Sequence, residues 1–301
     1  IALGGSSIQT ELVDLYAVNA QDLYAVGFND YYGVGAIWRF DGTRWSNIHW
    51  WEPGQPRQAD FSSIIGFGGT DIYAAGASYG STSNSALIVR FDGQQWTQIA
   101  LPGRPLQTIA GRSPSDIWAA GILNSVFNYD GFQWTMIGVD ERLWFQDLAI
   151  LGNRAYALAY KVDIEPFDTT WHFFLSWSGT QWDTLQTTVE VAGASFSPQF
   201  GPYSLSVVDG QLYSGGFGIF KWKEDYWEKL FERGGEVFGT SDRNLFILDF
   251  PGGVFHFNGT DLHQYAQFQS TSFRMTSGWS DGREVFIVGT NFSQSIALHG
   301  K

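Results

Sequence analysis

Apolar and polar residues alternate in short runs along the whole chain, and turn residues separate the runs. The stretch that begins at Ser62 reads SSIIGF and is followed, after a Gly-Gly-Thr turn, by DIYAAG and then by ALIVRF. Alternation with a period of two residues predicts half-buried β-strands, and glycine-rich breaks of this kind predict tight turns. The pattern therefore favours an all-β fold.

One six-residue strand pattern returns at intervals of about 44 residues, which is the period of a four-stranded propeller blade. Its seven copies are DLYAVG at Asp22, DIYAAG at Asp71, DIWAAG at Asp116, RAYALA at Arg154, QLYSGG at Gln211, NLFILD at Asn244 and EVFIVG at Glu284. The sequence thus contains seven related repeats.

A predicted hairpin follows six of these copies. In five of the six its first strand ends at Asp-Gly, Ser-Gly or Asn-Gly, and its second strand carries an aromatic residue, as in FDGQQWTQI from Phe91. Asp-Gly and Asn-Gly suit a two-residue turn in which both central residues have positive φ. We expect the outer-strand tryptophans to lie in the core of the blades; they are Trp45, Trp96, Trp134, Trp182 and Trp227.

Each repeat then holds four strands, and residues 1–301 form one domain, a seven-bladed β-propeller of antiparallel blades. Small residues in the second strand are expected to let neighbouring blades approach closely. The last repeat ends before its fourth strand. We predict that an N-terminal strand, with SSIQTEL from Ser6 as the candidate, completes the last blade and closes the ring.

The hairpins at Phe40 (FDGTRW) and Phe91 (FDGQQW) resemble a shortened Asp-box of the BNR-type repeats in sialidases, sortilin-like receptors and many secreted bacterial propellers. The pair DIWAAG and YDGFQW is similar to the tandem propeller repeats of exported bacterial proteins without an assigned activity. This resemblance covers nearly the whole chain, although the last three blades are degenerate. It implies the fold and leaves the function open, because the turn is structural.

Composition agrees with this fold and narrows the range of partners. Aromatic residues make up 17% of the chain and glycine occurs 36 times, whereas charged residues make up 16%. The formal charge is −13 without a cluster of Lys and Arg, so nucleic acid and anionic membranes are unlikely partners. No apolar run approaches the ~18 residues of a membrane span, and the chain has no cysteine.

The chain starts at IALGGSS without an initiator methionine, from which we expect an exported protein whose signal peptide has been removed. The expected location is secreted, periplasmic or cell-surface.

Enzyme signatures are missing from the sequence. It contains no G-x-S-x-G, no H-E-x-x-H, no Walker A motif and no G-x-G-x-x-G that opens a helix. Sialidase chemistry would require three arginines around the substrate carboxylate, but several arginines here flank turns on the opposite face. We expect no cofactor and no metal site, and we favour a protein that is not an enzyme.

The longest connections all lie on one predicted face, which carries the loops between the second and third strands and between blades. These connections bring together aromatic side chains at Tyr31, Tyr32, Trp50, Trp51, Tyr79, Trp171, Phe200 and Tyr203, beside His172. The same connections carry carboxylates at Asp30, Glu52, Asp60, Asp163, Glu165 and Asp168. Aromatic planes beside carboxylates suit sugar rings or a partner protein, although long loops also pack their own aromatics.

Three hypotheses follow for the function. The first is a binding or assembly module for a glycan or protein ligand, which would contact Tyr31, Tyr32, Trp50, Trp51, Tyr79, Trp171, His172 and Tyr203. The second is a polysaccharide hydrolase or lyase, for which Glu165, Asp168 and Glu52 are the candidate acids and bases. The third is a structural subunit of an extracellular assembly.

Overall fold

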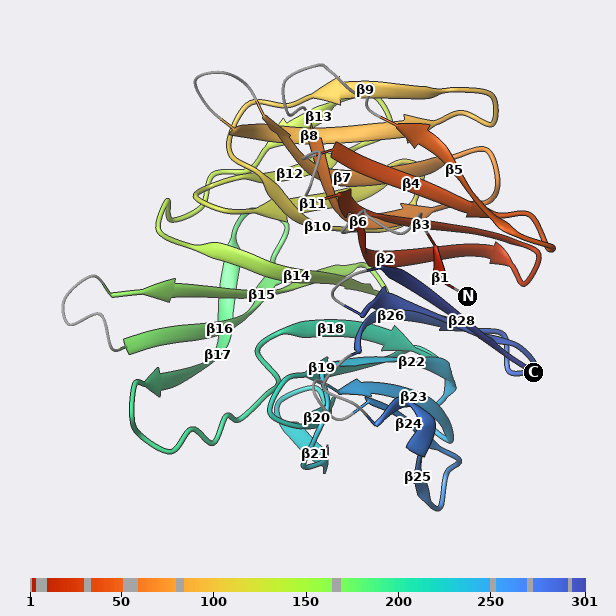
Figure 1. Ribbon diagram of the computed structural model, residues 1–301. Coiled ribbons are helices and arrows are strands. Elements are labelled where there is room, and N and C mark those ends of the chain that lie inside the picture. The colour runs from red at the N-terminus through yellow and green to blue at the C-terminus, as the bar shows by residue number, and fades with distance from the viewer. Residues whose placement is uncertain are drawn as a thin grey trace.

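The computed structural model describes residues 2–3, 10–29, 34–50, 59–79, 84–163, 169–249, 253–269, 273–291 and 294–301 of the chain. These residues form an all-β, seven-bladed propeller, which confirms the predicted fold class (Figure 1). The one helix within the described residues is the short 3-10 helix η1 (Ala266–Phe268). No helix in these ranges is long and apolar enough to cross a membrane.

The first four blades follow one another along the chain, each with four strands. Blade 1 contains β2 (Thr10–Asn19), β3 (Asp22–Asn29), β4 (Val34–Phe40) and β5 (Trp45–Trp50). Blade 2 contains β6 (Ala59–Gly66), β7 (Ile72–Tyr79), β8 (Asn84–Phe91) and β9 (Trp96–Ala100). Blade 3 contains β10 (Leu106–Ser113), β11 (Asp116–Gly121), β12 (Val126–Tyr129) and β13 (Trp134–Met136). Blade 4 contains β14 (Trp144–Leu151), β15 (Arg154–Val162), β16 (Thr169–Trp177) and β17 (Trp182–Val191).

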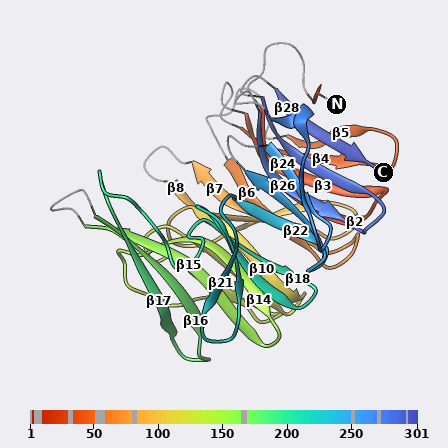
Figure 2. The ribbon, with the colours of Figure 1, turned by 90° about the horizontal axis from the view of Figure 1, so that it is seen from below.

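The remaining three blades complete the ring. Blade 5 contains β18 (Ser204–Val208), β19 (Gln211–Gly215), β20 (Ile219–Trp222) and β21 (Trp227–Phe231). Blade 6 contains β22 (Glu236–Ser241), β23 (Asn244–Asp249), β24 (Gly253–Phe257) and β25 (Leu262–Gln264). Blade 7 contains β26 (Arg274–Ser280), β27 (Val285–Thr290) and β28 (Ser295–Gly300). Figure 2 shows β15, β16 and β17 on the side of the molecule away from both termini.

Blade 7 is completed from the N-terminus, but not by the segment that the sequence suggested. The two-residue strand β1 (Ala2–Leu3) pairs antiparallel with β28, so that the two ends of the chain lie close together (Figure 1). The predicted closing segment began at Ser6. Its described part, from Thr10 to Leu12, belongs instead to β2, the inner strand of blade 1. Residues 4–9 lie outside the described ranges.

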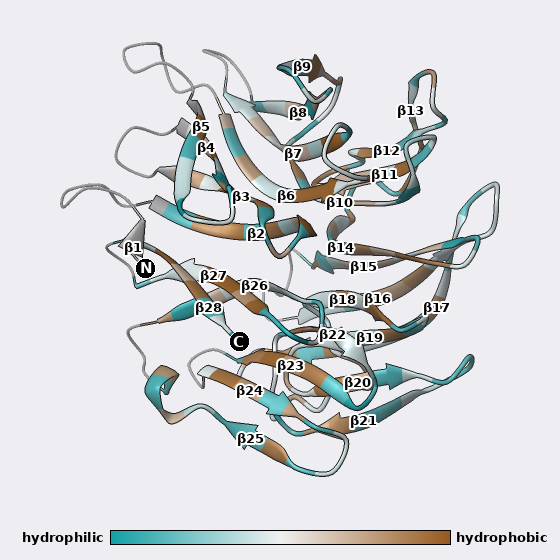
Figure 3. Cartoon of the chain, turned by 90° about the vertical axis from the view of Figure 1, so that its right-hand side faces the viewer, coloured by the Kyte–Doolittle hydropathy of each residue, from teal (hydrophilic) through white to brown (hydrophobic). Residues whose placement is uncertain are grey.

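The hydrophobic core is divided among the seven boundaries between neighbouring blades, which we call seams. Side chains of the second strand alternate between two seams: Leu23 and Ala25 pack against blade 7, whereas Tyr24 packs against blade 2. Apolar segments accordingly lie along strands such as β23 and β27 (Figure 3). Of the outer tryptophans predicted to lie in the core, Trp227 is buried there, whereas four are half-buried and pack against the clusters; these are Trp45, Trp96, Trp134 and Trp182.

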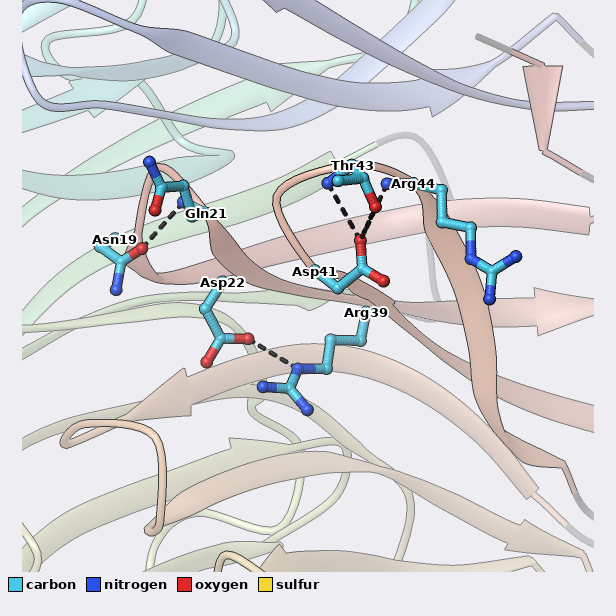
Figure 4. A network of polar contacts seen from close by, with 7 residues as sticks. All are labelled: Asn19, Gln21, Asp22, Arg39, Asp41, Thr43 and Arg44. Atoms are coloured by element: carbon cyan, nitrogen blue, oxygen red, sulfur yellow. Dashed lines mark hydrogen bonds and ion pairs between the residues drawn. The ribbon is translucent and has the colours of Figure 1, made fainter.

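The turns between the third and fourth strands are held by a side chain. Asp41 Oδ1 accepts hydrogen bonds from the backbone N–H groups of Thr43 and Arg44 at 3.0 and 2.9 Å (Figure 4). These bonds, led by one from the Thr43 hydroxyl, lower the pKa of Asp41 to about 2. The same pattern recurs at Asp92, Asp130 and Asn258.

The expected turn with two positive φ angles is therefore wrong for these hairpins. In the first of them the glycine alone is left-handed, with φ of 89° at Gly42, and the loop between the paired residues Phe40 and Trp45 has four residues. Asp suits this position because its carboxylate reaches forward to the N–H groups, as does the side-chain oxygen of Asn258 in blade 6. A nearby ion pair from Arg39 Nε to Asp22 Oδ1, 2.7 Å long, ties the third strand to the start of the second (Figure 4).

The glycine that ends the repeated second-strand pattern accommodates an irregularity within its own blade. A Cβ on Gly121 would overlap the backbone carbonyl of Pro105 at the start of β10, where the register of the pairing shifts. Gly27, Gly76 and Gly289 meet the equivalent carbonyl in their own blades. Alanines of the second strand, such as Ala74 and Ala75, lie in the seams between blades, as expected for small residues there. The glycines instead make room for a bulge of the inner strand in their own blade.

We predict that Gly121→Ala lowers the free energy of unfolding by about 1–3 kcal/mol, because the new methyl group must displace backbone. Gly138→Ala is the matched control, since a Cβ there meets no atom within 4 Å and the backbone is not left-handed. Urea unfolding followed by tryptophan fluorescence measures both. Equal stabilities of the two variants would contradict the close approach.

Candidate functional site

A cavity of about 1040 Å³ lies along the axis of the propeller and is lined by the inner strands of all seven blades. It is also lined by Tyr79 at the end of β7, by Tyr203 from an inter-blade connection and by Phe217 from a second-to-third-strand connection. We call the face that carries these connections the loop face and the opposite one the turn face. No described turn of the turn face contributes to the lining, so the cavity opens on the loop face.

One position of the inner strand is polar in every blade. In each case it pairs with the fifth residue of the repeated second-strand pattern, which makes the seven positions structurally equivalent. The set, which we call the polar ring, consists of Asp14, Ser63, Thr108, Asp147, Ser204, Glu236 and Ser277. All except Ser277 line the cavity.

Asp14 joins blade 1 to both of its neighbours. Its Oδ2 accepts hydrogen bonds from the Ser63 hydroxyl at 2.9 Å and from the Ile64 backbone N–H at 2.8 Å, both in blade 2. Its Oδ1 accepts from the Leu15 N–H at 2.7 Å and from the Ser277 hydroxyl of blade 7 at 2.9 Å. One carboxylate thereby bridges two seams.

Asp147 has the same role in blade 4. Its Oδ1 accepts from the Thr108 hydroxyl of blade 3 at 2.9 Å and from its neighbour's N–H, that of Leu148, at 2.8 Å. Its Oδ2 accepts from the Leu205 N–H of blade 5 at 2.7 Å. Hydrogen bonds to an ionised acceptor are stronger than those between neutral groups, so these contacts are effective inter-blade ties.

The other three seams are bridged at the same level of the channel wall. Ser62 donates a hydrogen bond to the Leu106 carbonyl at 2.9 Å, between blades 2 and 3, and Ser204 donates one to the Gly235 carbonyl at 2.6 Å, between blades 5 and 6. Glu236 and Ser277 are hydrogen-bonded to each other between blades 6 and 7. Every seam of the propeller therefore has a polar tie next to the channel.

Burial in the channel wall raises the pKa of all three ring carboxyls. It raises the pKa of Asp14, and that of Asp147 to about 6, although the hydrogen bonds oppose the effect. The pKa of Glu236 lies well above its usual range, because burial acts together with the negative charges of Asp14 and Asp147. Glu236 is thus the ring carboxyl that holds a proton most strongly.

The proton on Glu236 can be donated in a hydrogen bond to the hydroxyl oxygen of Ser277. This hydroxyl lies between two carboxyl groups, those of Asp14 and Glu236, yet a serine hydroxyl has a single hydrogen to donate. Donation to Asp14 leaves its oxygen to accept a hydrogen bond from a protonated Glu236. Both hydrogen bonds, from Glu236 to Ser277 and from Ser277 to Asp14, can form when the two carboxyl groups together carry one proton.

An aromatic cluster flanks the cavity mouth at blades 4 and 5. The ring of Tyr203 lies 5.5 Å from that of Phe217 and 6.3 Å from that of His172, and Phe196 lies 5.1 Å from Phe217, all measured between centroids. Tyr203 and Phe217 are 44% and 46% exposed and line the cavity. They form an aromatic wall that is open to a ligand.

Phe217 is held in an unfavourable backbone conformation. Its φ is 57°, and it lies between Gly216 and Gly218 in the turn from β19 to β20. A left-handed conformation is costly for a bulky residue, and such strain is concentrated at functional sites. The glycines on either side allow the turn, while the phenylalanine supplies the ring at the mouth.

His172 lies behind the aromatic wall. It is 5% exposed, and its Nε2 is 3.2 Å from Glu190 Oε2. Burial lowers its pKa, against the opposing effect of Glu190. His172 therefore supports Tyr203 as a neutral ring, and its Nδ1 has no hydrogen-bond partner within the described residues.

Of the predicted ligand contacts, the structure brings Tyr79 and Tyr203 to the cavity, where the Tyr79 hydroxyl donates to Asp60. Trp171 lies on the other face of its sheet from His172, since neighbouring residues of a strand alternate. Its Nε1 donates to Asp163 Oδ2 at 2.7 Å. Trp171 and His172, both predicted to contact the ligand, therefore lie on opposite faces of the blade 4 sheet.

The other predicted residues fall in two groups. Phe200 is fully buried between blades 4 and 5, so it packs and does not face a ligand. Trp50 is the last residue of β5, where it pairs with Ala36, and not part of a loop. Outside the described residues lie Tyr31, Tyr32, Trp51, Asp30 and the proposed acids Glu52, Glu165 and Asp168.

Neither the polar ring nor Phe217 was among the residues predicted from the sequence. The ring was accessible in principle, because aligning the inner strands on the repeated second strand places seven polar residues at one position. Phe217 had a weaker signal, a Gly-Phe-Gly sequence in a degenerate blade. Among the described residues, no group of three or more His, Asp or Glu side chains could hold a metal ion.

No protein-family model and no curated protein matches this sequence. Solved structures match the fold at low identity. The chain is similar to YCF48 bound to D1 peptide, with 14% identity, a TM-score of 0.68, and coverage of 100% of this chain and 96% of that one. YCF48 from Cyanidioschyzon merolae matches at 12% identity with a TM-score of 0.58, over 99% and 97% of the two chains.

A third similar structure is the extracellular domain of a putative one component system from B. thetaiotaomicron. It is 12% identical with a TM-score of 0.59, and the match covers 98% of this chain but 43% of that one. At these identities the likeness establishes a shared propeller fold and leaves the ligand open.

We predict that replacing Glu236 alters the pH dependence of stability. Its pKa is higher in the folded than in the unfolded chain, so its stabilising contribution is complete below about pH 4.5 and is lost as the pH rises through the folded pKa. Glu236→Gln copies the protonated form. Relative to the unmutated chain, it should gain up to about 1.4 kcal/mol per pH unit above pH 4.5.

Urea unfolding between pH 4.5 and 9 measures this gain. The matched control is Glu228→Gln, which removes an exposed carboxyl of β21 and should follow the unmutated chain. A stability difference for Glu236→Gln that does not change with pH would show that the ring carries no such proton.

A second prediction concerns the strain at Phe217. Glycine accepts positive φ, whereas alanine there carries a penalty of about 1 kcal/mol, so Phe217→Gly should be more stable than Phe217→Ala by about that amount. Both variants lose the aromatic ring, so its packing contribution cancels when their free energies of unfolding are compared. Thermal or urea unfolding gives the order, and the usual order, alanine above glycine, would refute the strain. At Phe132, which lacks positive φ, that usual order is expected.

Proposed function

We propose that this chain is a binding module that holds an extended segment of a partner protein at the mouth of its axial cavity, on the loop face. The observation that carries the proposal is the exposed aromatic pair Tyr203 and Phe217 at the rim of a cavity of about 1040 Å³. Exposed aromatic anchors beside a preformed hollow are typical of recognition sites.

The construction of the site supports binding. Phe217 keeps a strained backbone and nearly half of its surface in solvent, although a polar or glycine residue would fit the turn with less strain. The polar ties at the seams hold the rim residues of seven blades in fixed positions. A rigid rim lowers the entropic cost of binding.

Similar proteins support a protein ligand. The fold is shared with YCF48, whose structure was solved with a D1 peptide, and with an extracellular domain of a putative one component system. We extend both features to this chain as part of the proposal: a peptide ligand, and a location that is secreted, periplasmic or at the cell surface, in an extracellular assembly. The proposal keeps as additional contacts Trp50, at the end of β5, and Tyr31, Tyr32 and Trp51, which lie outside the described residues.

Selection of a phage-displayed library of random 12-residue peptides on the immobilised chain tests this function. We expect enriched clones whose synthetic peptides bind the unmutated chain and bind Phe217→Ala at least about tenfold more weakly, because the aromatic anchor is lost. Fluorescence polarisation with labelled peptides gives the dissociation constants.

The matched control is Phe132→Ala, which removes a 93% exposed ring from a turn on the opposite face and should leave binding unchanged. Absence of enriched peptides, or equal binding by Phe217→Ala, would contradict the proposal. A glycan array run in parallel identifies the alternative ligand class, since binding of glycans without peptides would replace the protein ligand by a sugar.

A further inference from the structure

The charges that line the axial cavity are strongly unbalanced. Among the described residues that line it, the carboxyl groups are those of Asp14, Asp60, Asp147, Glu232, Glu236 and Asp249, and the guanidinium groups are those of Arg233 and Arg274. The described lining therefore carries more carboxyl groups than its two arginines can neutralise.

The few cations near the rim already have acidic neighbours. Arg274 Nη1 is 3.3 Å from Glu11 Oε1, and Arg233 lies close enough to Asp249 to lower its pKa against the effect of burial. Lys229, just outside the lining, is paired with Glu232. The rim arginines are thus engaged with carboxylates of the rim.

Deeper in the channel, no cationic side chain of the described residues pairs with the carboxylates of Asp14 and Asp147. Each hydrogen bond that Asp14 and Asp147 accept comes from a hydroxyl or a backbone N–H, and both donor types are neutral. Both carboxylates are half-buried in the wall of a cavity that water enters. A carboxylate without a nearby cation attracts positive charge, and the attraction is stronger in a channel walled by protein than in open water.

The aromatic wall lies on the route to these carboxylates. Tyr203 and Phe217 line the same cavity as Asp147, and Ser204, next to Tyr203, is a member of the polar ring. Lysine and arginine side chains have apolar stems that pack on aromatic rings and charged ends that bind carboxylates. An extended peptide at the rim could lay a stem on this wall and direct its charged end inward.

We propose that the partner segment is basic, and that one of its lysine or arginine side chains passes the Tyr203–Phe217 wall and enters the axial channel toward Asp14 and Asp147. This inference rests on the proposed function and names the chemistry of its ligand. The charge balance of the cavity and the neutral surroundings of the two carboxylates carry it. A neutral sugar would leave both carboxylates without a countercharge.

The sequences and charge dependence of the selected 12-residue peptides test this inference. We expect enriched peptides to share a Lys or Arg beside an aromatic residue or proline. Replacing that basic residue in the synthetic peptide by Gln should weaken binding by at least about tenfold, and by Glu further still. Affinity should also fall as NaCl is raised from 50 to 500 mM.

In the protein, Asp147→Asn should weaken binding of the basic peptide. It should also reduce the difference in affinity between the peptide with Lys or Arg and its Gln variant. The control is Glu228→Gln, whose side chain does not line the cavity. Since Asp147 also ties blades together, the substitutions within the peptide keep the test valid if this variant does not fold.

The outcomes separate the two proposals. Peptides that need Phe217 but tolerate the replacement of Lys or Arg by Gln would overturn the basic ligand and leave the binding function standing. A lack of any enriched peptide would overturn the binding function itself. Loss of binding for the Gln peptide, together with a reduced loss in Asp147→Asn, is the result that this inference requires.

Discussion

The hydrogen bonds that tie neighbouring blades at the channel wall are the interaction on which the rest of the structure depends. Apolar packing fills the outer part of each seam, but near the axis the inner strands converge and leave a channel. A polar residue at one equivalent position of every inner strand, from Asp14 to Ser277, supplies six of the seven ties there, and Ser62 supplies the one between blades 2 and 3. Two kinds of contact therefore close the ring of blades: the polar ties at the channel wall, and the pairing of β1 with β28.

This closure also generates the chemistry of the channel. Three of the seven ring residues are carboxyls, and two of them, Asp14 and Asp147, bridge blades because a carboxylate has two oxygens, each of which accepts several hydrogen bonds. The stabilising role brings negative charge into a cavity that water reaches from the loop face. Asp147 and Glu236 respond with raised pKa values, and the charge that remains selects for a cation. Stability and recognition thus share the same side chains.

The fold could be predicted because each of its elements is repeated. The seven second-strand patterns fix the number of blades, and the alternation within DIYAAG or ALIVRF fixes the strand type. Details that are not repeated were harder to predict. The closing strand is β1 and not the stretch from Ser6, because two residues of pairing are too few to leave a pattern in the sequence.

The candidate site was predicted only in part. Loop length pointed to the face on which the cavity opens, and Tyr79 and Tyr203 line that cavity, whereas their contact with a ligand stays a prediction. Phe200 is buried because the connection that carries it packs between blades 4 and 5. The importance of Phe217 depends on a backbone angle, and that of Asp147 on contacts with Thr108 and Leu205 from other blades. Such properties arise from tertiary structure and cannot be obtained from one segment alone.

The central claim is that the polar ring holds its proton on Glu236 and leaves negative charge facing the channel. The most direct measurement is a ¹³C NMR titration of the labelled Asp and Glu carboxyl carbons, assigned with the Asp14→Asn, Asp147→Asn and Glu236→Gln variants. The account predicts that Asp147 titrates near pH 6 and that Glu236 releases its proton last of the three. Titration of Glu236 before Asp147, or together with the exposed carboxyls, would contradict it.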